Sequence, residues 1–217
     1  MFERLSEALS DTPLIALLSR APPRAQCSSS GRILHLGGFP LKFEKTIRDP
    51  IHGLIRVTED DRRVIDTAVF QRLRRIKQLA LTNYVFPGAL HTRFEHSLGA
   101  LETAYRMTER LSEVGVEVED RDRKILRCAA LLHDIGHGPF SHAAENFFEF
   151  PVEDGKSLGH EKASVDLIRN HPDLEFLGEI GEAAAALLEV WKGPRTFIRD
   201  IVSSTLDADT TLACGMD

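Results

Sequence analysis

The sequence predicts a mainly α-helical domain with one small β-hairpin near its N-terminal end. Apolar residues recur at three- and four-residue spacing along most of the chain after residue 66, which is the periodicity of amphipathic helices. Strand-like alternation is weak except in KTIRDPIHGLIRVTE, where we expect the hairpin. A length of 217 residues fits one domain with a substantial core better than two domains.

Residues 1–43 differ in composition from the rest and are expected to form a flexible extension. A short amphipathic helix is predicted over Leu5–Leu18. The stretch APPRAQCSSSGR that follows has the proline, serine and glycine content of a linker. We therefore expect the folded domain to span residues 44–217.

Three helices are predicted in the first part of this domain. Asp66 is a candidate N-cap for the first, in which apolar positions recur from Val69 to Leu79. Thr92 and Glu95 have the spacing of a capping box at the start of the second. The third covers RDRKILRCAALLHD and is expected to end at the glycines and proline of IGHGPF. Further helices are predicted over residues 160–170, 176–191 and 194–205.

Composition and charge limit the partners that the protein is expected to bind. A net charge of −6 argues against nucleic acid as the main ligand. No apolar run reaches the length of a membrane span and the N-terminus lacks a signal-peptide pattern, so we expect a cytoplasmic protein without membrane partners. The stretch QRLRRIKQ is either a solvated helix face or a binding surface for a polyanionic substrate. Three scattered cysteines indicate free thiols, with Cys128 in the core.

Histidines are concentrated in one part of the chain. Six of the nine lie within a 70-residue window: His91, His96, His133, His137, His142 and His160. His133 and Asp134 end a predicted buried helix, and successive helical side chains diverge by about 100°, so both can reach an ion just beyond the helix end. A buried carboxylate there requires a cation or several strong donors. The alternative is that His133 is an ordinary hydrogen-bonded core residue.

Further ligands for such an ion are available in neighbouring segments. His96 lies in the first turn of the preceding predicted helix, where it can meet His133 if the two helices pack together. An acidic pair in LDAD, Asp207 and Asp209, follows another predicted helix. Imidazoles combined with carboxylates suit one divalent ion such as Mn, Fe, Zn or Mg, and they leave positions open for water and substrate.

Several motifs follow one another along the chain, namely KTIRDPIHGLIRV, RFEHS, HDIGHGPFSH, GHEKAS and IVSSTLDAD. From about Lys45 to Asp209 they resemble the HD-domain deoxynucleoside triphosphate triphosphohydrolase family, which includes dGTPase-like enzymes. The resemblance implies an HD-domain helical bundle. It also implies a reaction in which water attacks the α-phosphorus of a dNTP, dGTP included. The products would be a deoxynucleoside and inorganic triphosphate.

The same resemblance implies roles for individual residues. The protein ligands of one divalent metal ion would be His96, His133, Asp134 and Asp209. The general acid would be His142, supported by Glu145 and His160. The triphosphate would be contacted by Arg93 and His137. The deoxyribose would lie against Gln78 and Leu79.

Four more residues resemble a site for an activating nucleotide such as GTP: Lys45, Asp66, Gln71 and Arg74. Asp66 is explained equally well as a plain helix N-cap. Such a site would need residues of a partner subunit. We therefore expect a homo-oligomer or an assembly with a full-length family partner.

The C-terminal end departs from the family pattern. After LDAD the family continues with a basic residue and an Asp-Tyr pair, whereas Thr210, Leu212 and Ala213 stand here. The domain is therefore expected to be C-terminally incomplete. Three functions stay open: a dNTP triphosphohydrolase, another HD-domain nucleotidase or phosphodiesterase, and a catalytically inactive truncated or regulatory HD protein.

Overall fold

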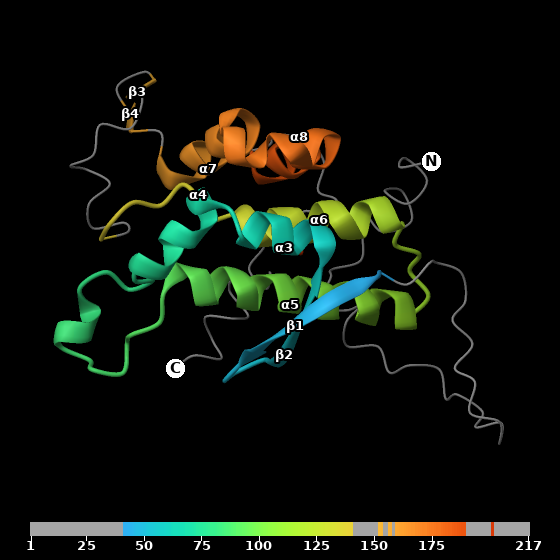
Figure 1. The fold of residues 1–217 in the computed structure, drawn as a ribbon, viewed down its shortest axis with the longest axis horizontal. Helices are drawn as coiled ribbons and strands as arrows, with labels where there is room; N and C mark the ends of the chain where they lie inside the picture. The colour runs from blue at the N-terminus through green and yellow to red at the C-terminus, as the bar shows by residue number, and fades with distance from the viewer. Residues whose placement is uncertain (1–40, 141–151, 154–155, 158, 190–200, 202–217) are drawn as a thin grey trace.

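The structure is a computed structural model that describes residues 41–140, 152–153, 156–157, 159–189 and 201. In this part of the chain, a helical bundle packs beside a two-stranded hairpin (Figure 1). The mainly α fold with a small N-terminal hairpin is thereby confirmed. The predicted helix over Leu5–Leu18, the linker after it and, apart from Ile201, the predicted helix over residues 194–205 lie outside the described residues.

The hairpin consists of antiparallel strands β1 (Phe43–Asp49) and β2 (Gly53–Thr58). Asp49 closes the turn, because its Oδ1 accepts hydrogen bonds from the backbone N–H groups of Ile51, at 2.9 Å, and His52, at 2.8 Å. Gly53 then adopts φ +78°, a conformation that favours glycine. Ile55 on β2 is fully buried and packs in the hydrophobic core with the helices, which stabilises the position of the hairpin.

The region after the hairpin corrects one prediction. Helix α3 (Glu59–Ile65) ends at Asp66, which is its C-cap and not the N-cap of the next helix. Thr67 takes that role for α4 (Ala68–Gln71), since its Oγ1 accepts from the backbone N–H of Phe70 at 3.3 Å. Two adjacent residues can both cap a helix, and the sequence favoured the wrong one.

The prediction of one long helix from Val69 to Leu79 is also wrong, because the helical part of this segment ends before Ile76. After α4 the chain forms a 3₁₀ turn, η1 (Arg72–Arg75), and becomes extended at Ile76. The reason is tertiary: the Ile76 carbonyl accepts from the backbone N–H of Arg93 at 2.8 Å, which fixes an extended segment beside the next helix. A second 3₁₀ turn, η2 (Thr82–Tyr84), follows.

Two long helices form the centre of the bundle. Helix α5 (Arg93–Glu113) begins with the predicted capping box, in which Thr92 and Glu95 each accept from the other's backbone N–H. Helix α6 (Asp120–Leu132) packs beside α5 and ends at His133, its C-cap. In Figure 1, α5 lies on one side of α6, and α7 and α8 lie on the other.

The remaining described elements follow the short hairpin β3 (Val152–Glu153) and β4 (Lys156–Ser157), which was not predicted. Helix α7 (Gly159–Asn170) matches its prediction closely. The next predicted helix divides into a 3₁₀ segment, η4 (Pro172–Leu177), and helix α8 (Gly178–Leu188). Pro172 explains the early start, because proline fits the first turn of a helix. None of the described helices is both long and apolar enough to cross a bilayer.

Candidate metal centre

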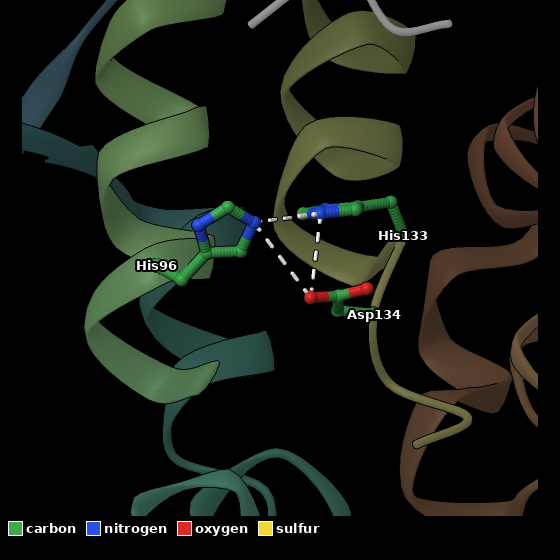
Figure 2. A group of neighbouring side chains, drawn as sticks. All are labelled: His96, His133 and Asp134. Atoms are coloured by element: carbon green, nitrogen blue, oxygen red, sulfur yellow. Dashed lines mark hydrogen bonds and ion pairs between the residues drawn. The ribbon is translucent and has the colours of Figure 1, made fainter. Parts of the chain in front are cut away.

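The packing of α5 against α6 brings three predicted metal ligands together (Figure 2). His96 lies in the first turn of α5, and His133 and Asp134 lie at the end of α6. The Nε2 atoms of His96 and His133 are 3.3 Å apart. Asp134 Oδ2 is 3.7 Å from His96 Nε2 and 3.6 Å from His133 Nε2. One atom of each side chain therefore points to a common position.

This triangle fits a single metal ion. Ligand atoms about 2.1 Å from a tetrahedral ion lie about 3.4 Å apart, which is close to the three distances observed. His133 Nδ1 is 2.8 Å from the Ala130 carbonyl oxygen. Because a carbonyl only accepts, Nδ1 carries a proton, and in the neutral imidazole Nε2 then presents its lone pair to His96 and Asp134. This is the tautomer that a metal ligand requires.

The charge of Asp134 is maintained despite its burial. Burial alone would raise the pKa of this carboxyl, but the surrounding groups lower the pKa well below its usual range. Those groups, from the largest effect to the smallest, are His133, His137, Arg93 and His96. Arg93 on α5 contacts Asp134 directly through Nη1. Since the Arg93 charge is permanent, Asp134 is an anion near neutral pH even beside neutral imidazoles, as metal binding demands.

A second group shares Asp134. His137 Nε2 lies 3.3 Å from Asp134 Oδ1, and the His137 ring stacks on that of His160 with centroids 3.8 Å apart and planes at 15°. Asp134, His137 and His160 are also close enough to hold a metal ion. Burial lowers the pKa of His137 to about 4, against the raising effect of Asp134, so this imidazole is neutral near pH 7.

The residues expected to contact deoxyribose lie near the start of α5. A β-bridge between Lys77 and Thr92 aligns the segment before α5 with the helix N-terminus, and Gln78 N donates to the His91 carbonyl at 3.1 Å. Gln78 Oε1 is a buried acceptor that no donor of the described residues satisfies. The neighbouring Leu79 is 45% exposed.

The predicted nucleotide group is only partly assembled. Arg74 Nε donates to Gln71 Oε1 at 2.7 Å. Asp66 instead pairs with Arg62, at 3.1 Å. Lys45 lies on β1, and among the described interactions none joins it to the other three residues. Three further predicted site residues lie outside the described residues: His142, Glu145 and Asp209.

Two residues near the centre had no individual role in the sequence-based predictions. Arg72, from the basic stretch QRLRRIKQ, is partly buried and donates to the main chain of the turn after α6. Ser164 on α7 is fully buried and bonds to the same turn. The positive charge of the basic stretch was a visible signal for Arg72, whereas nothing in the sequence distinguished Ser164 from other serines.

Comparisons with known proteins point to one family. A family model described as the HD domain matches residues 93–213. The chain is 41% identical over 165 residues to "Deoxynucleoside triphosphate triphosphohydrolase SAMHD1" of Gallus gallus, which covers 75% of this chain and 26% of the relative. It is 37% identical over 171 residues to "Deoxynucleoside triphosphate triphosphohydrolase SAMHD1 homolog" of Dictyostelium discoideum, covering 75% of this chain and 33% of the relative.

A solved structure agrees with these relatives. The crystal structure of a phosphohydrolase from Bacteroides thetaiotaomicron matches with a TM-score of 0.65 and 34% sequence identity. The match covers 76% of this chain and 39% of that one. The chain thus spans between about a quarter and two-fifths of the length of these three similar proteins.

Proposed function

Because the chain belongs to the HD-domain family, we propose that it is a divalent-metal-dependent phosphohydrolase whose substrates are dNTPs, dGTP among them. The products would be a deoxynucleoside and inorganic triphosphate. The observation that carries the proposal is the convergence of His96, His133 and Asp134, with the His133 tautomer suited to a metal ligand. The names of the relatives support the choice of substrate class.

In this proposal His96, His133 and Asp134 hold one divalent ion, with Asp209 as the fourth ligand that the family resemblance implies. When bound, such an ion supplies Lewis acidity at the reacting phosphate. The buried position of the triangle excludes bulk water from around Asp134, which strengthens electrostatic interactions there. Manganese, iron, zinc and magnesium are all compatible with these nitrogen and oxygen ligands.

The neighbouring residues would then orient the triphosphate and the leaving group. Arg93 contacts Asp134, so a phosphate oxygen bound by this guanidinium would lie beside the metal ligands. Neutral His137 would offer a ring N–H to a second oxygen. Water would attack the α-phosphorus, and the bond from phosphorus to the 5′ oxygen would break. The departing 5′ oxygen would take a proton from His142, the expected general acid.

The sugar would be recognised at the segment before α5. Gln78 Oε1, which no donor of the described residues satisfies, is a suitable acceptor for the 3′-hydroxyl of deoxyribose. Leu79 would provide an apolar wall that leaves no partner for a 2′-hydroxyl. The hydrogen-bonded pair of Gln71 and Arg74 is the part of the predicted activator group that favours including GTP in any assay.

The test is a product analysis. The purified chain is incubated with Mn²⁺ or Mg²⁺ and each of the four dNTPs, with and without GTP, and the products are separated by ion exchange. Deoxynucleoside with intact triphosphate is expected. Orthophosphate or pyrophosphate would indicate another HD-domain phosphohydrolase, and a folded, metal-loaded protein without turnover would indicate an inactive or regulatory one.

A further inference from the structure

The turn that follows α6 carries three of the side chains discussed above on five consecutive residues, His133–His137. The last carbonyl groups of a helix lack intrahelical donors, so each needs another partner. Two are satisfied within the turn: Leu132 O accepts from Ile135 N, and Asp134 O accepts from His137 N, both at 3.1 Å. Three more carbonyls, those of His133, Ile135 and His137, are satisfied by side chains from elsewhere in the chain.

Arg72 satisfies two of these carbonyls. From η1, its Nη1 donates to the His137 carbonyl at 2.6 Å and its Nη2 donates to that of Ile135. The planar guanidinium can span two acceptors in fixed geometry, which the single ammonium of a lysine cannot do. Its positive charge also lies at the negative end of the α6 dipole. Its neighbour Arg75, in the same 3₁₀ turn, is exposed.

Ser164 holds the turn from α7. Its Oγ donates to the His133 carbonyl at 2.7 Å and accepts from the backbone N–H of Gly136 at 2.8 Å. The approach of the two segments is close, because a Cβ on Gly136 would lie 2.3 Å from the His160 carbonyl oxygen and 2.4 Å from Ser164 N. Only glycine permits this contact without displacement of α7.

We infer that Arg72 and Ser164 are positioning residues that set the metal affinity of the centre by fixing the main chain of residues 133–137. Neither side chain belongs to the triangle of ligand atoms. Both bind carbonyl and N–H groups of the main chain, and the position of this main chain determines where the side chains of His133 and Asp134 are placed. Groups that orient metal ligands in this way typically contribute about 10- to 100-fold to metal affinity. The inference rests on the proposed function only in taking His96, His133 and Asp134 as metal ligands.

A metal titration tests this role independently of nucleotide hydrolysis. Co²⁺ is the probe, since its visible absorption reports the ligand set, and the dissociation constant is measured well below the unfolding transition. For Arg72→Ala and Ser164→Ala we expect a dissociation constant raised by about tenfold or more. Arg72→Lys should bind Co²⁺ more tightly than Arg72→Ala but less tightly than the wild type, because lysine keeps the positive charge but cannot bind both carbonyls as the guanidinium does. The matched control Arg75→Gln, in the same 3₁₀ turn, should bind as the wild type does.

A merely structural role would give a different pattern. Both alanine variants would then lower the unfolding temperature of the metal-free chain and leave the dissociation constant and the Co²⁺ spectrum unchanged, which would overturn the inference. If Arg72→Ala does not fold, Ser164→Ala and Arg72→Lys decide the question by the same criterion. A wild-type chain that binds Co²⁺ without hydrolysing dNTPs would contradict the proposed function alone. A folded wild-type chain that binds no Co²⁺ would contradict both proposals.

Discussion

Helix α6 and the turn that follows it carry two buried ionic centres about two helical turns apart, and their partners differ in kind. Arg127 pairs with Asp61 of α3, with Nη2 to Oδ2 at 2.7 Å and Nε to Oδ2 at 3.1 Å. The same Asp61 oxygen also accepts from Thr58 N and Oγ1, at 2.8 and 2.7 Å. Every described partner of the Asp61 carboxylate is thus a hydrogen-bond donor, and the Arg127 guanidinium balances its charge without a bound cation.

At the other centre, the Asp134 carboxylate contacts the Arg93 guanidinium and also faces imidazoles. In the neutral imidazole of His133, Nδ1–H donates to the Ala130 carbonyl and Nε2 directs its lone pair toward Asp134 Oδ2. A lone pair and a carboxylate oxygen repel each other unless a cation lies between them. The difference teaches how a structural ion pair can be distinguished from a ligand centre. Asp61 meets only donors among its described partners, whereas Asp134 accepts from Arg93 and in addition shares one position with two imidazole nitrogens.

The largest expected effect is a loss of hydrolysis when the Asp134 centre is changed, with no such loss when the Asp61 centre is changed. Asp134→Asn keeps the shape of the side chain but removes the anion that the metal ion would need. We expect metal-dependent hydrolysis to fall to the level of the metal-free protein, measured as triphosphate released from dGTP. Asp61→Asn should retain hydrolysis under the same conditions. Equal activity in wild type and Asp134→Asn would show that the centre around Asp134 is not needed for hydrolysis.

The second prediction concerns the structural centre. Asp61→Ala would leave the Arg127 guanidinium buried without its carboxylate, and we expect the free energy of unfolding to fall by about 3–5 kcal/mol. The measurement is urea denaturation followed by circular dichroism. The adjacent and exposed Asp60→Ala is the control, with little change expected. Similar losses from both substitutions would show that the pair of Asp61 and Arg127 has no special role.

The third prediction concerns the turn His133–His137, which follows α6 and lies against α7. Gly136→Ala inserts a Cβ into the main chain of α7, and overpacking of this kind costs about 1–3 kcal/mol of stability. Gly88→Ala is the matched control, because its added Cβ would meet no atom within 4 Å. Thermal unfolding of both variants checks the difference. A Gly136→Ala protein as stable as Gly88→Ala would mean that the close contact with α7 is dispensable.

The smallest expected effect concerns the reactivity of the buried Cys128 thiol. Burial, with a smaller contribution from Asp61 and Asp60, raises the pKa of the Cys128 thiol to about 12. Cys128 therefore stays protonated and inert at pH 8. In a Cys27→Ser, Cys214→Ser background, a thiol-reactive dye should label the chain only after denaturant is added. Rapid labelling of the native protein would show that this part of α6 opens readily.

The ends of the central helices were predictable because local chemistry determines them. Thr92 and Glu95 satisfy each other's backbone groups within one turn, and the cluster of His133 and Asp134 follows directly from helix geometry. The boundary at Asp66 and Thr67 was not predictable, since either side chain can accept the same backbone hydrogen bond. Arg72 and Ser164 could not be assigned, because their partners lie 63 to 65 and 28 to 31 residues away.

In the proposed reaction, water attacks the α-phosphorus of a dNTP. The most direct measurement is hydrolysis of dGTP with Mn²⁺ in oxygen-18-labelled water, followed by mass spectrometry of both products. We expect the label in inorganic triphosphate and none in deoxyguanosine. Label in the deoxynucleoside, or in released orthophosphate or pyrophosphate, would contradict the proposed reaction.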